Sequence, residues 1–97
     1  MSGRRRYLVA YDIRNVGRLR KVHNVVKSFG LSMQYSVFLC DLDKIELIKL
    51  REALLETLRQ GIDTVAIVDL GQVGASTERF EFLGSTPKLP HGGPTIV

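Results

Sequence analysis

The sequence predicts an α+β domain in which two helices cover one side of an antiparallel sheet. Apolar strand segments and amphipathic helical segments follow one another in the order strand, helix, strand or strand pair, helix, strand. The length of 97 residues suits one domain, and 44% hydrophobic with 25% charged residues is typical of a folded, water-soluble chain. The composition therefore argues against a disordered or fibrous protein.

The first strand and the first helix occupy the basic first third of the chain. Residues 6–13 form a strand candidate whose two faces are both mostly apolar. Asn15 then suits the N-cap of a helix, in which apolar residues recur at helical spacing as far as Phe29. Gly30 fits the C′ position, so we expect the helix to end just before it.

The middle of the chain repeats this alternation. Residues 31–42 are rich in β-branched and aromatic residues and predict either one long strand or two strands joined by a tight kink. Asp43 and Glu46 have the spacing of a capping box, which predicts a second helix that runs toward Gly61. Residues 64–70, TVAIVDL, are the clearest remaining strand.

The chain is expected to end in a short strand and a tail. Residues 80–83 alternate between apolar and polar side chains, which predicts an additional short C-terminal strand. All three prolines lie in the tail, whose last three residues could add a strand or an anchor to another chain. We therefore divide the chain into a domain at residues 1–84 and a tail at residues 85–97, a candidate partner-binding segment.

The expected element order is that of a ferredoxin-like βαββαβ sandwich. An antiparallel sheet of this kind often has one face in water, but the strands here are apolar on both faces. We therefore expect the face away from the helices to be covered. A second copy of the chain, in a two-fold homodimer, is the simplest cover.

Positive charge is concentrated near the N-terminus. The formal charge is +4, and Asp12 is the only acid before residue 31. Such a field attracts polyanions such as nucleic acid, although a solvated helix face would give the same pattern. The basic residues of this stretch are Arg4, Arg5, Arg6, Arg14, Arg18, Arg20, Lys21 and Lys27.

Several function classes lack the residues that they need. Cys40 is the only cysteine, so neither an intramolecular disulfide nor a cysteine zinc site can form within one chain. The sequence contains no run of about 18 apolar residues and no signal peptide, which predicts a cytoplasmic protein without a membrane segment. His23 lies inside the first helix and His91 in the tail, and we assign neither a catalytic role.

Asp12 is the candidate catalytic and metal-binding residue. It ends the first strand before a basic helix, where a carboxylate could hold a divalent cation while arginines hold phosphates. Mg²⁺ can be bound by one or two carboxylates with water and substrate phosphate oxygens, so two copies of Asp12 in a dimer would be enough. The residues alone favour a structural role instead, in which Asp12 caps the turn or pairs with Arg14 or Arg18.

Ser36 and Phe38 share one face of the central strand segment. The hydroxyl could contact a phosphate and the ring could stack on a base, although a Phe in so apolar a strand is more often a core or interface residue. Arg18 and Arg20 carry a similar ambiguity. Their clustering beside Asp12 favours contact with phosphates.

Four segments together resemble a known family. They are YDI at residues 11–13, the basic first helix, FGLSMQYSVF at residues 29–38 and FEFLG at residues 80–84. In this order and spacing they resemble the small CRISPR-associated adaptation endonuclease family, whose dimeric members partner the spacer integrase. The likeness extends from residue 7 to about residue 84.

The resemblance implies a ferredoxin-like homodimer that exchanges its C-terminal strand, with magnesium-dependent phosphodiesterase activity on RNA or double-stranded DNA. Asp12 corresponds to the family's metal-binding aspartate. Leu39 stands where many members carry an acid, so no role is transferred to that position. Taken together, the residues and the resemblance give seven nucleic-acid-binding candidates: Tyr11, Arg14, Arg18, Arg20, Lys21, Ser36 and Phe38.

The family also implies a second role, as a scaffold that bridges two integrase dimers while DNA lies across its basic surface. That role does not require catalysis by Asp12. One carboxylate per chain is also a small set of catalytic groups for hydrolysis. Two further classes share this fold. An acylphosphatase-type hydrolase would need an arginine loop signature that this chain lacks, and an RNA-binding module would need more surface aromatics on its central strands.

Overall fold

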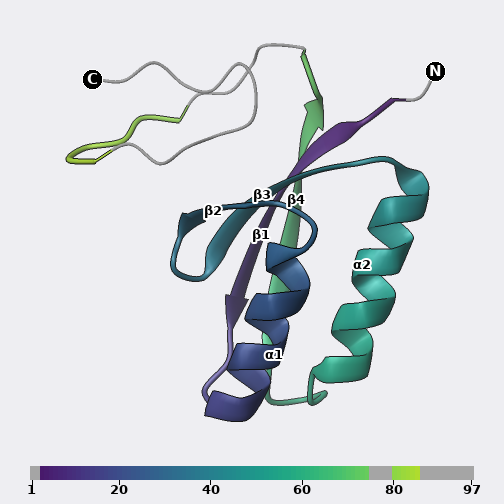
Figure 1. The fold of residues 1–97 in the computed structure, drawn as a ribbon, viewed down its shortest axis with the longest axis vertical. Helices are drawn as coiled ribbons and strands as arrows, with labels where there is room; N and C mark the ends of the chain where they lie inside the picture. Colours follow the sequence, from purple (N-terminus) through teal and green to yellow (C-terminus); the bar gives the residue numbers. More distant parts are fainter. Residues whose placement is uncertain (1–2, 75–79, 86–97) are drawn as a thin grey trace.

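The computed structural model describes residues 3–74 and 80–85, which form a four-stranded antiparallel sheet with two helices on one face (Figure 1). This arrangement confirms the predicted ferredoxin-like βαββαβ architecture. Its elements are β1 (Arg5–Asp12), α1 (Val16–Lys27), β2 (Leu31–Gln34), β3 (Val37–Leu42), α2 (Lys44–Thr57) and β4 (Thr64–Gln72).

The sheet has the strand order β2-β3-β1-β4, so the first strand lies in its interior. Val9 of β1 pairs with Phe38 of β3 on one side and with Ile67 of β4 on the other. Because β1 is flanked on both sides, its backbone groups are used in the sheet and its two faces are the surfaces left for packing. The face toward the helices packs in the core, which explains the apolar residues on that side of the strand.

The stretch at residues 31–42 forms two strands rather than one. β2 and β3 pair with each other as a hairpin, and Tyr35 and Ser36 make the turn between them. The backbone N–H of Tyr11 donates to the Ser36 carbonyl at 3.1 Å, which ties the turn to the end of β1. The kink that the sequence left open is therefore a β-turn beside the first strand.

Both predicted helix starts are confirmed. The Asn15 side chain accepts from the backbone N–H of Arg18 at 2.9 Å. Asp43 and Glu46 form a complete capping box, in which each side chain accepts from the other residue's backbone N–H. These short-range bonds supply acceptors for N–H groups that have no partner inside the helix.

Gly30 has a different role from the one expected. The cap at the end of α1 is Ser28, and the left-handed conformation of a C′ glycine is absent at position 30. A Cβ at Gly30 would instead collide with the Leu39 carbonyl oxygen and lie 2.5 Å from Cys40 Sγ. The glycine is needed because the chain passes directly against β3.

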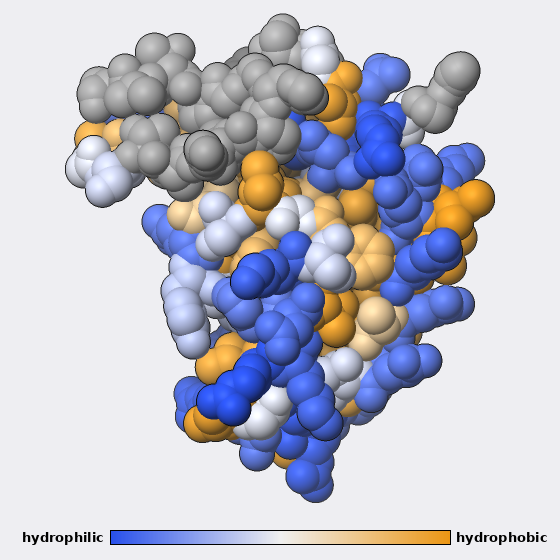
Figure 2. Space-filling view, viewed as in Figure 1, coloured by the Kyte–Doolittle hydropathy of each residue, from blue (hydrophilic) through white to orange (hydrophobic). Residues whose placement is uncertain are grey.

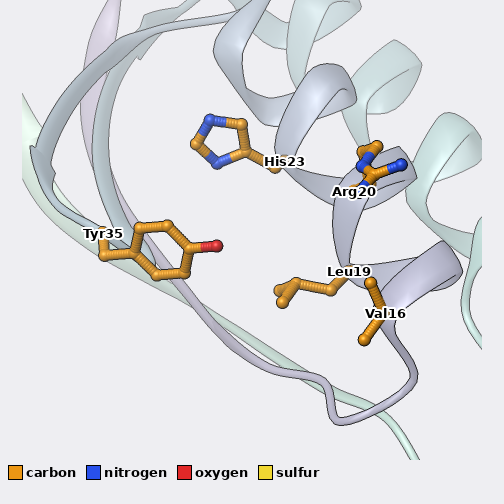
Figure 3. Close-up of a pocket in the computed structure, with 5 residues that line it drawn as sticks. All are labelled: Val16, Leu19, Arg20, His23 and Tyr35. Atoms are coloured by element: carbon orange, nitrogen blue, oxygen red, sulfur yellow. The ribbon is translucent and has the colours of Figure 1, made fainter.

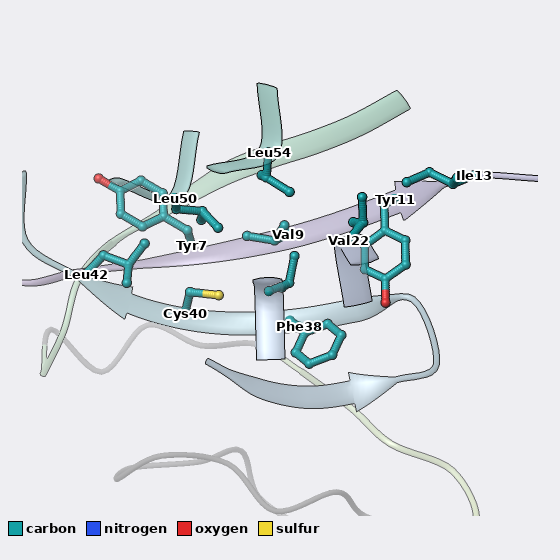
Figure 4. Close-up of a cluster of buried hydrophobic side chains, with 11 residues drawn as sticks. Tyr7, Val9, Tyr11, Ile13, Val22, Phe38, Cys40, Leu42, Leu50 and Leu54 are labelled. Carbon is teal, nitrogen blue, oxygen red and sulfur yellow. The ribbon is translucent and has the colours of Figure 1, made fainter. Parts of the chain in front are cut away.

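The core lies between the sheet and the two helices (Figure 4). Alternate residues of β1 and β3 point into it, and α1 and α2 each contribute two fully enclosed side chains. Burial of the Cys40 thiol among them raises its pKa to about 12, so it stays protonated and unreactive at neutral pH. The core cluster comprises Tyr7, Val9, Tyr11, Ile13, Val22, Val26, Phe38, Cys40, Leu42, Leu50 and Leu54.

The short strand expected at residues 80–83 does not form within the single chain. A strand is formed by hydrogen bonds to a neighbouring strand. In the described chain, the sheet contains only the four strands β1, β2, β3 and β4. The rings of Phe80 and Phe82 stack instead, with centroids 6.0 Å apart. Exchange of this segment with a second chain stays a prediction, and most of the expected tail, residues 86–97, lies outside the described residues.

The face of the sheet away from the helices carries both apolar and ionic groups. Leu8 and Ala10 are half-buried, and Val68 beside them is 46% exposed. Arg6 of β1, 2% exposed, pairs with Asp41 of β3 at 2.8 and 3.0 Å. The homodimer expected to cover this face stays a prediction. None of the helices described is both long and apolar enough to cross a membrane.

Candidate functional site

Asp12 lies at the C-terminal end of β1, in register with Thr64 of β4. Its side chain is exposed, and within residues 3–74 and 80–85 it makes no hydrogen bond or ion pair. The structural roles considered from the sequence, a turn cap or a pair with Arg14 or Arg18, are therefore absent from the described chain. The carboxylate is left accessible to a ligand.

Arg18 is held by a carboxylate from a distant part of the chain. Its guanidinium donates to both carboxylate oxygens of Asp63, at 2.6 and 3.2 Å. The Asp63 side chain is inaccessible to solvent and also accepts from the backbone N–H of Arg59. The Arg18 guanidinium, first, and the Arg59 N–H hold the pKa of Asp63 below its usual value. Arg18 thus fastens α1 to the loop before β4 instead of presenting its charge to phosphates.

The other basic candidates are on the surface. Arg14, Arg20 and Lys21 are all exposed, and the described part of the chain gives none of them an ion pair. Figure 2 shows hydrophilic side chains gathered over α1, the helix that contains Arg20 and Lys21. Arg14 follows Asp12 by two residues, so one accessible positive charge is close to the exposed carboxylate along the chain.

The aromatic and hydroxyl candidates of the sequence are mostly inside the protein. Phe38 is 1% exposed and packs against Tyr11, with ring centroids 6.2 Å apart. Burial raises the pKa of the Tyr11 phenol, so it remains neutral. Ser36 is partly buried, and its carbonyl holds the turn to β1. These residues shape the site from within and do not offer a ring face to a ligand.

A pocket that the sequence did not single out lies between α1 and the β2–β3 turn (Figure 3). Its volume is about 230 Å³, and it is lined by Val16, Leu19, Arg20, His23 and Tyr35. The pattern was present in the sequence, because residues 16, 19, 20 and 23 recur on one helix face at intervals of three and four. Tyr35 could not be assigned to that face without the hairpin.

The aromatic side chains around this pocket are connected. The Tyr11 hydroxyl lies 2.8 Å from His23 Nδ1 and donates to the Tyr35 carbonyl oxygen at 3.4 Å. The His23 ring meets Phe38 edge-on at 5.4 Å and lies nearly parallel to Tyr35 at 6.0 Å. The core residues Tyr11 and Phe38 therefore fix the His23 side of the pocket.

Comparison with known proteins identifies the family. Residues 5–77 match the sequence model of the family described as CRISPR associated protein Cas2. The chain belongs to the Cas2 family. It is similar to the CRISPR-associated endoribonuclease Cas2 of Geobacter sulfurreducens, with 39% identity over 82% of this chain and 84% of that protein. It also resembles a CRISPR-associated endonuclease Cas2 of Thermus thermophilus, with 44% identity over 72% of this chain and 67% of that protein.

Solved structures give the same result for the fold. A hypothetical protein from Thermus thermophilus superposes with a TM-score of 0.77 and 37% identity, over 89% of this chain and 98% of that one. Cas2 of Streptococcus pyogenes superposes with a TM-score of 0.71 and 27% identity, over 81% of this chain and 99% of that one. The ferredoxin-like sandwich described above is thus the fold of solved Cas2 proteins.

The donor set of this Cas2 chain fits a magnesium ion only if other ligands complete the shell. Within the described ranges, no three His, Cys, Asp or Glu side chains gather at one place, so Asp12 belongs to no such cluster. Mg²⁺ keeps several waters and takes one or two carboxylates together with substrate phosphates. A single exposed Asp12 per chain meets that demand when two copies, or one copy and a phosphodiester, come together.

Proposed function

We propose that this Cas2 protein is a metal-dependent endonuclease that acts on nucleic acid as a cytoplasmic homodimer during CRISPR spacer acquisition. The observation that carries the proposal is the exposed Asp12 carboxylate, which has no partner among the described residues and sits beside the accessible Arg14. An ionised group kept available in this way serves a ligand better than it serves the fold, because it contributes no contact to stability.

The substrate class follows from the charges around Asp12. Arg14, Arg20 and Lys21 are exposed and present positive charge that can hold phosphate groups, and the Asp12 side chain is exposed as well. The names of the similar proteins support this class, since the Geobacter protein is called an endoribonuclease and the Thermus protein an endonuclease. RNA or double-stranded DNA is therefore the expected substrate.

Each residue has a defined part in the reaction. Asp12 would hold Mg²⁺, and a bound Mg²⁺ supplies positive charge to the phosphate oxygens of the strand being cut. The exposed arginines would orient the phosphodiester by charge-assisted hydrogen bonds. The buried pair Tyr11 and Phe38 fixes the end of β1, and with it the position of the Asp12 backbone.

A scaffold role beside the spacer integrase is the alternative, and one observation favours it. One carboxylate per chain is fewer than the donor sets of most metal-dependent hydrolases, whereas the basic surface over α1 would suit DNA binding without any catalysis. The two roles share the same basic surface. They differ only in whether Asp12 is required.

The deciding experiment replaces Asp12 by Asn, which keeps the size of the side chain and removes its charge. Hydrolysis of labelled RNA and duplex DNA in Mg²⁺ should fall by at least about 100-fold, the scale of losing a charged group that stabilises a transition state. Glu52→Gln, an exposed acid on α2, is the matched control and should leave the rate unchanged. Chelation of the metal should abolish hydrolysis of the unaltered protein while binding persists.

Spacer acquisition is measured with the same variants. Acquisition that is lost together with hydrolysis in Asp12→Asn contradicts a purely scaffolding role. Acquisition that persists while hydrolysis is lost makes the scaffold the function that matters in the cell. Equal hydrolysis by Asp12→Asn and the unaltered protein would overturn the nuclease proposal.

A further inference from the structure

The pocket between α1 and the β2–β3 turn combines three kinds of group: an exposed aromatic ring, a cation and an apolar wall. Tyr35 is 74% exposed at the tip of the hairpin, so its ring is available to another molecule. Arg20 brings a positive charge to the same pocket, and Val16 with Leu19 supplies an apolar side. An aromatic face beside a cation and an apolar wall fits a flat ring that carries a phosphate.

The pocket is small. Its volume of about 230 Å³ lies below the range of about 300–1,000 Å³ that holds drug-sized ligands. A single heterocyclic ring suits this space better than a peptide or a folded partner does. The phosphate and the rest of a strand would then lie outside, over the exposed guanidinium of Arg20.

The walls of the pocket are fixed before a ligand arrives. His23 is held by the 2.8 Å contact with the Tyr11 hydroxyl and by its edge-on contact with Phe38 at 5.4 Å. The turn that carries Tyr35 is held by the bond from the Tyr11 N–H to the Ser36 carbonyl at 3.1 Å. Because these parts are already ordered, binding there has a low entropic cost.

The spacing of the rings decides how a base can lie. Tyr35 and His23 are nearly parallel, with centroids 6.0 Å apart. A flat ring contacted on both faces at about 3.5 Å would need roughly 7 Å between its neighbours. A base therefore stacks on one face of Tyr35 and is not enclosed between the two rings.

We infer that this pocket is a nucleobase subsite: an unpaired base stacks on Tyr35 against Val16 and Leu19, and the phosphate attached to it binds Arg20. The inference rests on the proposed action on nucleic acid and narrows it to a strand with an unpaired base. The Tyr11 hydroxyl contacts His23 in the pocket wall, and Asp12 is the next residue of β1, with its side chain toward the opposite face of the sheet.

The test measures binding of fluorescent ten-nucleotide strands to the full chain by anisotropy, without metal so that no cleavage occurs. The strands are oligouridylate, its deoxy counterpart, an abasic strand of the same length and a duplex. Tyr35→Ala should weaken binding of the two base-containing strands by about 5- to 150-fold, the effect of losing one stacked base. Tyr35→Phe, which keeps the ring, should bind as the unaltered protein does.

The other probes show whether the lost contact is stacking. Binding of the abasic strand and of the duplex should be the same for Tyr35→Ala and the unaltered protein, because neither offers an unpaired base. Arg20→Ala should weaken every single strand, including the abasic one, whereas Lys49→Ala, an exposed cation on α2, is the control for general charge. The ribose and deoxyribose strands then show which kind of unpaired strand the pocket prefers.

Three results would overturn the subsite. They are unchanged binding of oligouridylate by Tyr35→Ala, equal loss for the abasic strand, and a change of oligomeric state in Tyr35→Ala, which would make the pocket a contact between copies. These results are separate from the nuclease test. A base-dependent loss in Tyr35→Ala with no hydrolysis in Mg²⁺ keeps the subsite and rejects the nuclease, and hydrolysis that depends on Asp12 without a Tyr35 effect does the reverse.

Discussion

Arg18 and Arg20 are two residues apart on α1 and look alike in the sequence, but their surroundings are opposite. Arg18 meets the inaccessible carboxylate of Asp63 and joins the helix to the loop before β4. Arg20 has no ion pair within the described chain and lines the pocket beside Tyr35. Two positions on a helix are about 200° apart around its axis. One side of α1 therefore holds the fold together, and the other is exposed beside the pocket.

The largest expected effect is on stability and comes from the side that holds the fold. Arg18→Ala removes both hydrogen bonds that the guanidinium donates to the Asp63 carboxylate, so the melting temperature should fall by several degrees. Arg20→Ala removes an exposed side chain and should leave the melting temperature nearly unchanged. Thermal unfolding followed by circular dichroism measures both variants.

Two further variants show whether burial of the ion pair causes the loss of stability in Arg18→Ala. Arg5 also forms a two-bond pair with a carboxylate, Asp69, but both side chains of that pair are 48% exposed. Arg5→Ala should therefore cost much less than Arg18→Ala. The double variant Arg18→Ala/Asp63→Ala should recover part of the loss, because no unpaired charge remains. Equal losses from Arg5→Ala and Arg18→Ala would contradict this account.

A smaller loss of stability is expected at Tyr11, the core residue that contacts His23 in the pocket wall. Tyr11→Phe keeps the ring that packs on Phe38 but removes the hydroxyl that lies 2.8 Å from His23 Nδ1. Losing this contact together with the 3.4 Å bond to the Tyr35 carbonyl should lower the free energy of unfolding by about 1–2 kcal/mol. Urea titration measures this change, and Tyr35→Phe, at an exposed position, is the matched control with no expected change. Equal stability of Tyr11→Phe and the unaltered protein would mean that water replaces the bond.

The salt dependence of binding affinity should distinguish Arg20, which is expected to contact a phosphate, from Arg18, which is not. Each phosphate neutralised by a side chain contributes about 0.7 to the slope of log affinity against log salt for a single strand. Arg20→Ala should therefore make the slope shallower by roughly that amount, and Arg18→Ala should leave it unchanged. Affinities for oligouridylate between low and physiological salt give the slopes. A shallower slope in Arg18→Ala would show that the ion pair with Asp63 opens to bind nucleic acid.

Most of the fold could be predicted from the sequence because its signals are local. Helix caps bind within three or four residues, so Asn15 and the Asp43–Glu46 box could be recognised without the rest of the chain. Strand alternation likewise predicted strands at β1 and β3, although both faces of β1 looked apolar and its core face could not be chosen. The segment at residues 80–83 has the same alternation and forms no strand in the described chain, because a strand also needs a partner strand, which local alternation does not specify.

Much less of the site could be predicted, because its contacts are between distant residues. The partner of Arg18 lies 45 residues further along the chain, so nothing near Arg18 distinguishes it from Arg20. The same holds for Phe38 and Tyr35, three positions apart, of which only the second offers its ring to solvent. Asp12 was correctly placed at the end of a strand, whereas its catalytic and metal-binding roles stay predictions.

The smallest expected effect is the pH dependence of the free energy of unfolding that the Arg18–Asp63 pair contributes. The Arg18 guanidinium, followed by the Arg59 N–H, keeps the pKa of Asp63 below its usual value, so folded Asp63 binds protons less readily than the unfolded chain does. The contribution of the pair is therefore complete above the unfolded pKa of about 3.9 and is lost as the pH falls through that value toward the lower folded pKa.

Asp63→Asn tests this sign directly. The difference in free energy of unfolding between the unaltered protein and Asp63→Asn should be constant from about pH 5 to pH 7 and should shrink below about pH 4. Asp69, whose pKa is lowered by Arg5 in the same direction, is present in both proteins and cancels in the difference. Urea titrations at each pH provide the measurement. A difference that grows on acidification would show that protonated Asp63 is better accommodated than the ion pair, and that Arg18, like Arg20, is available to a ligand.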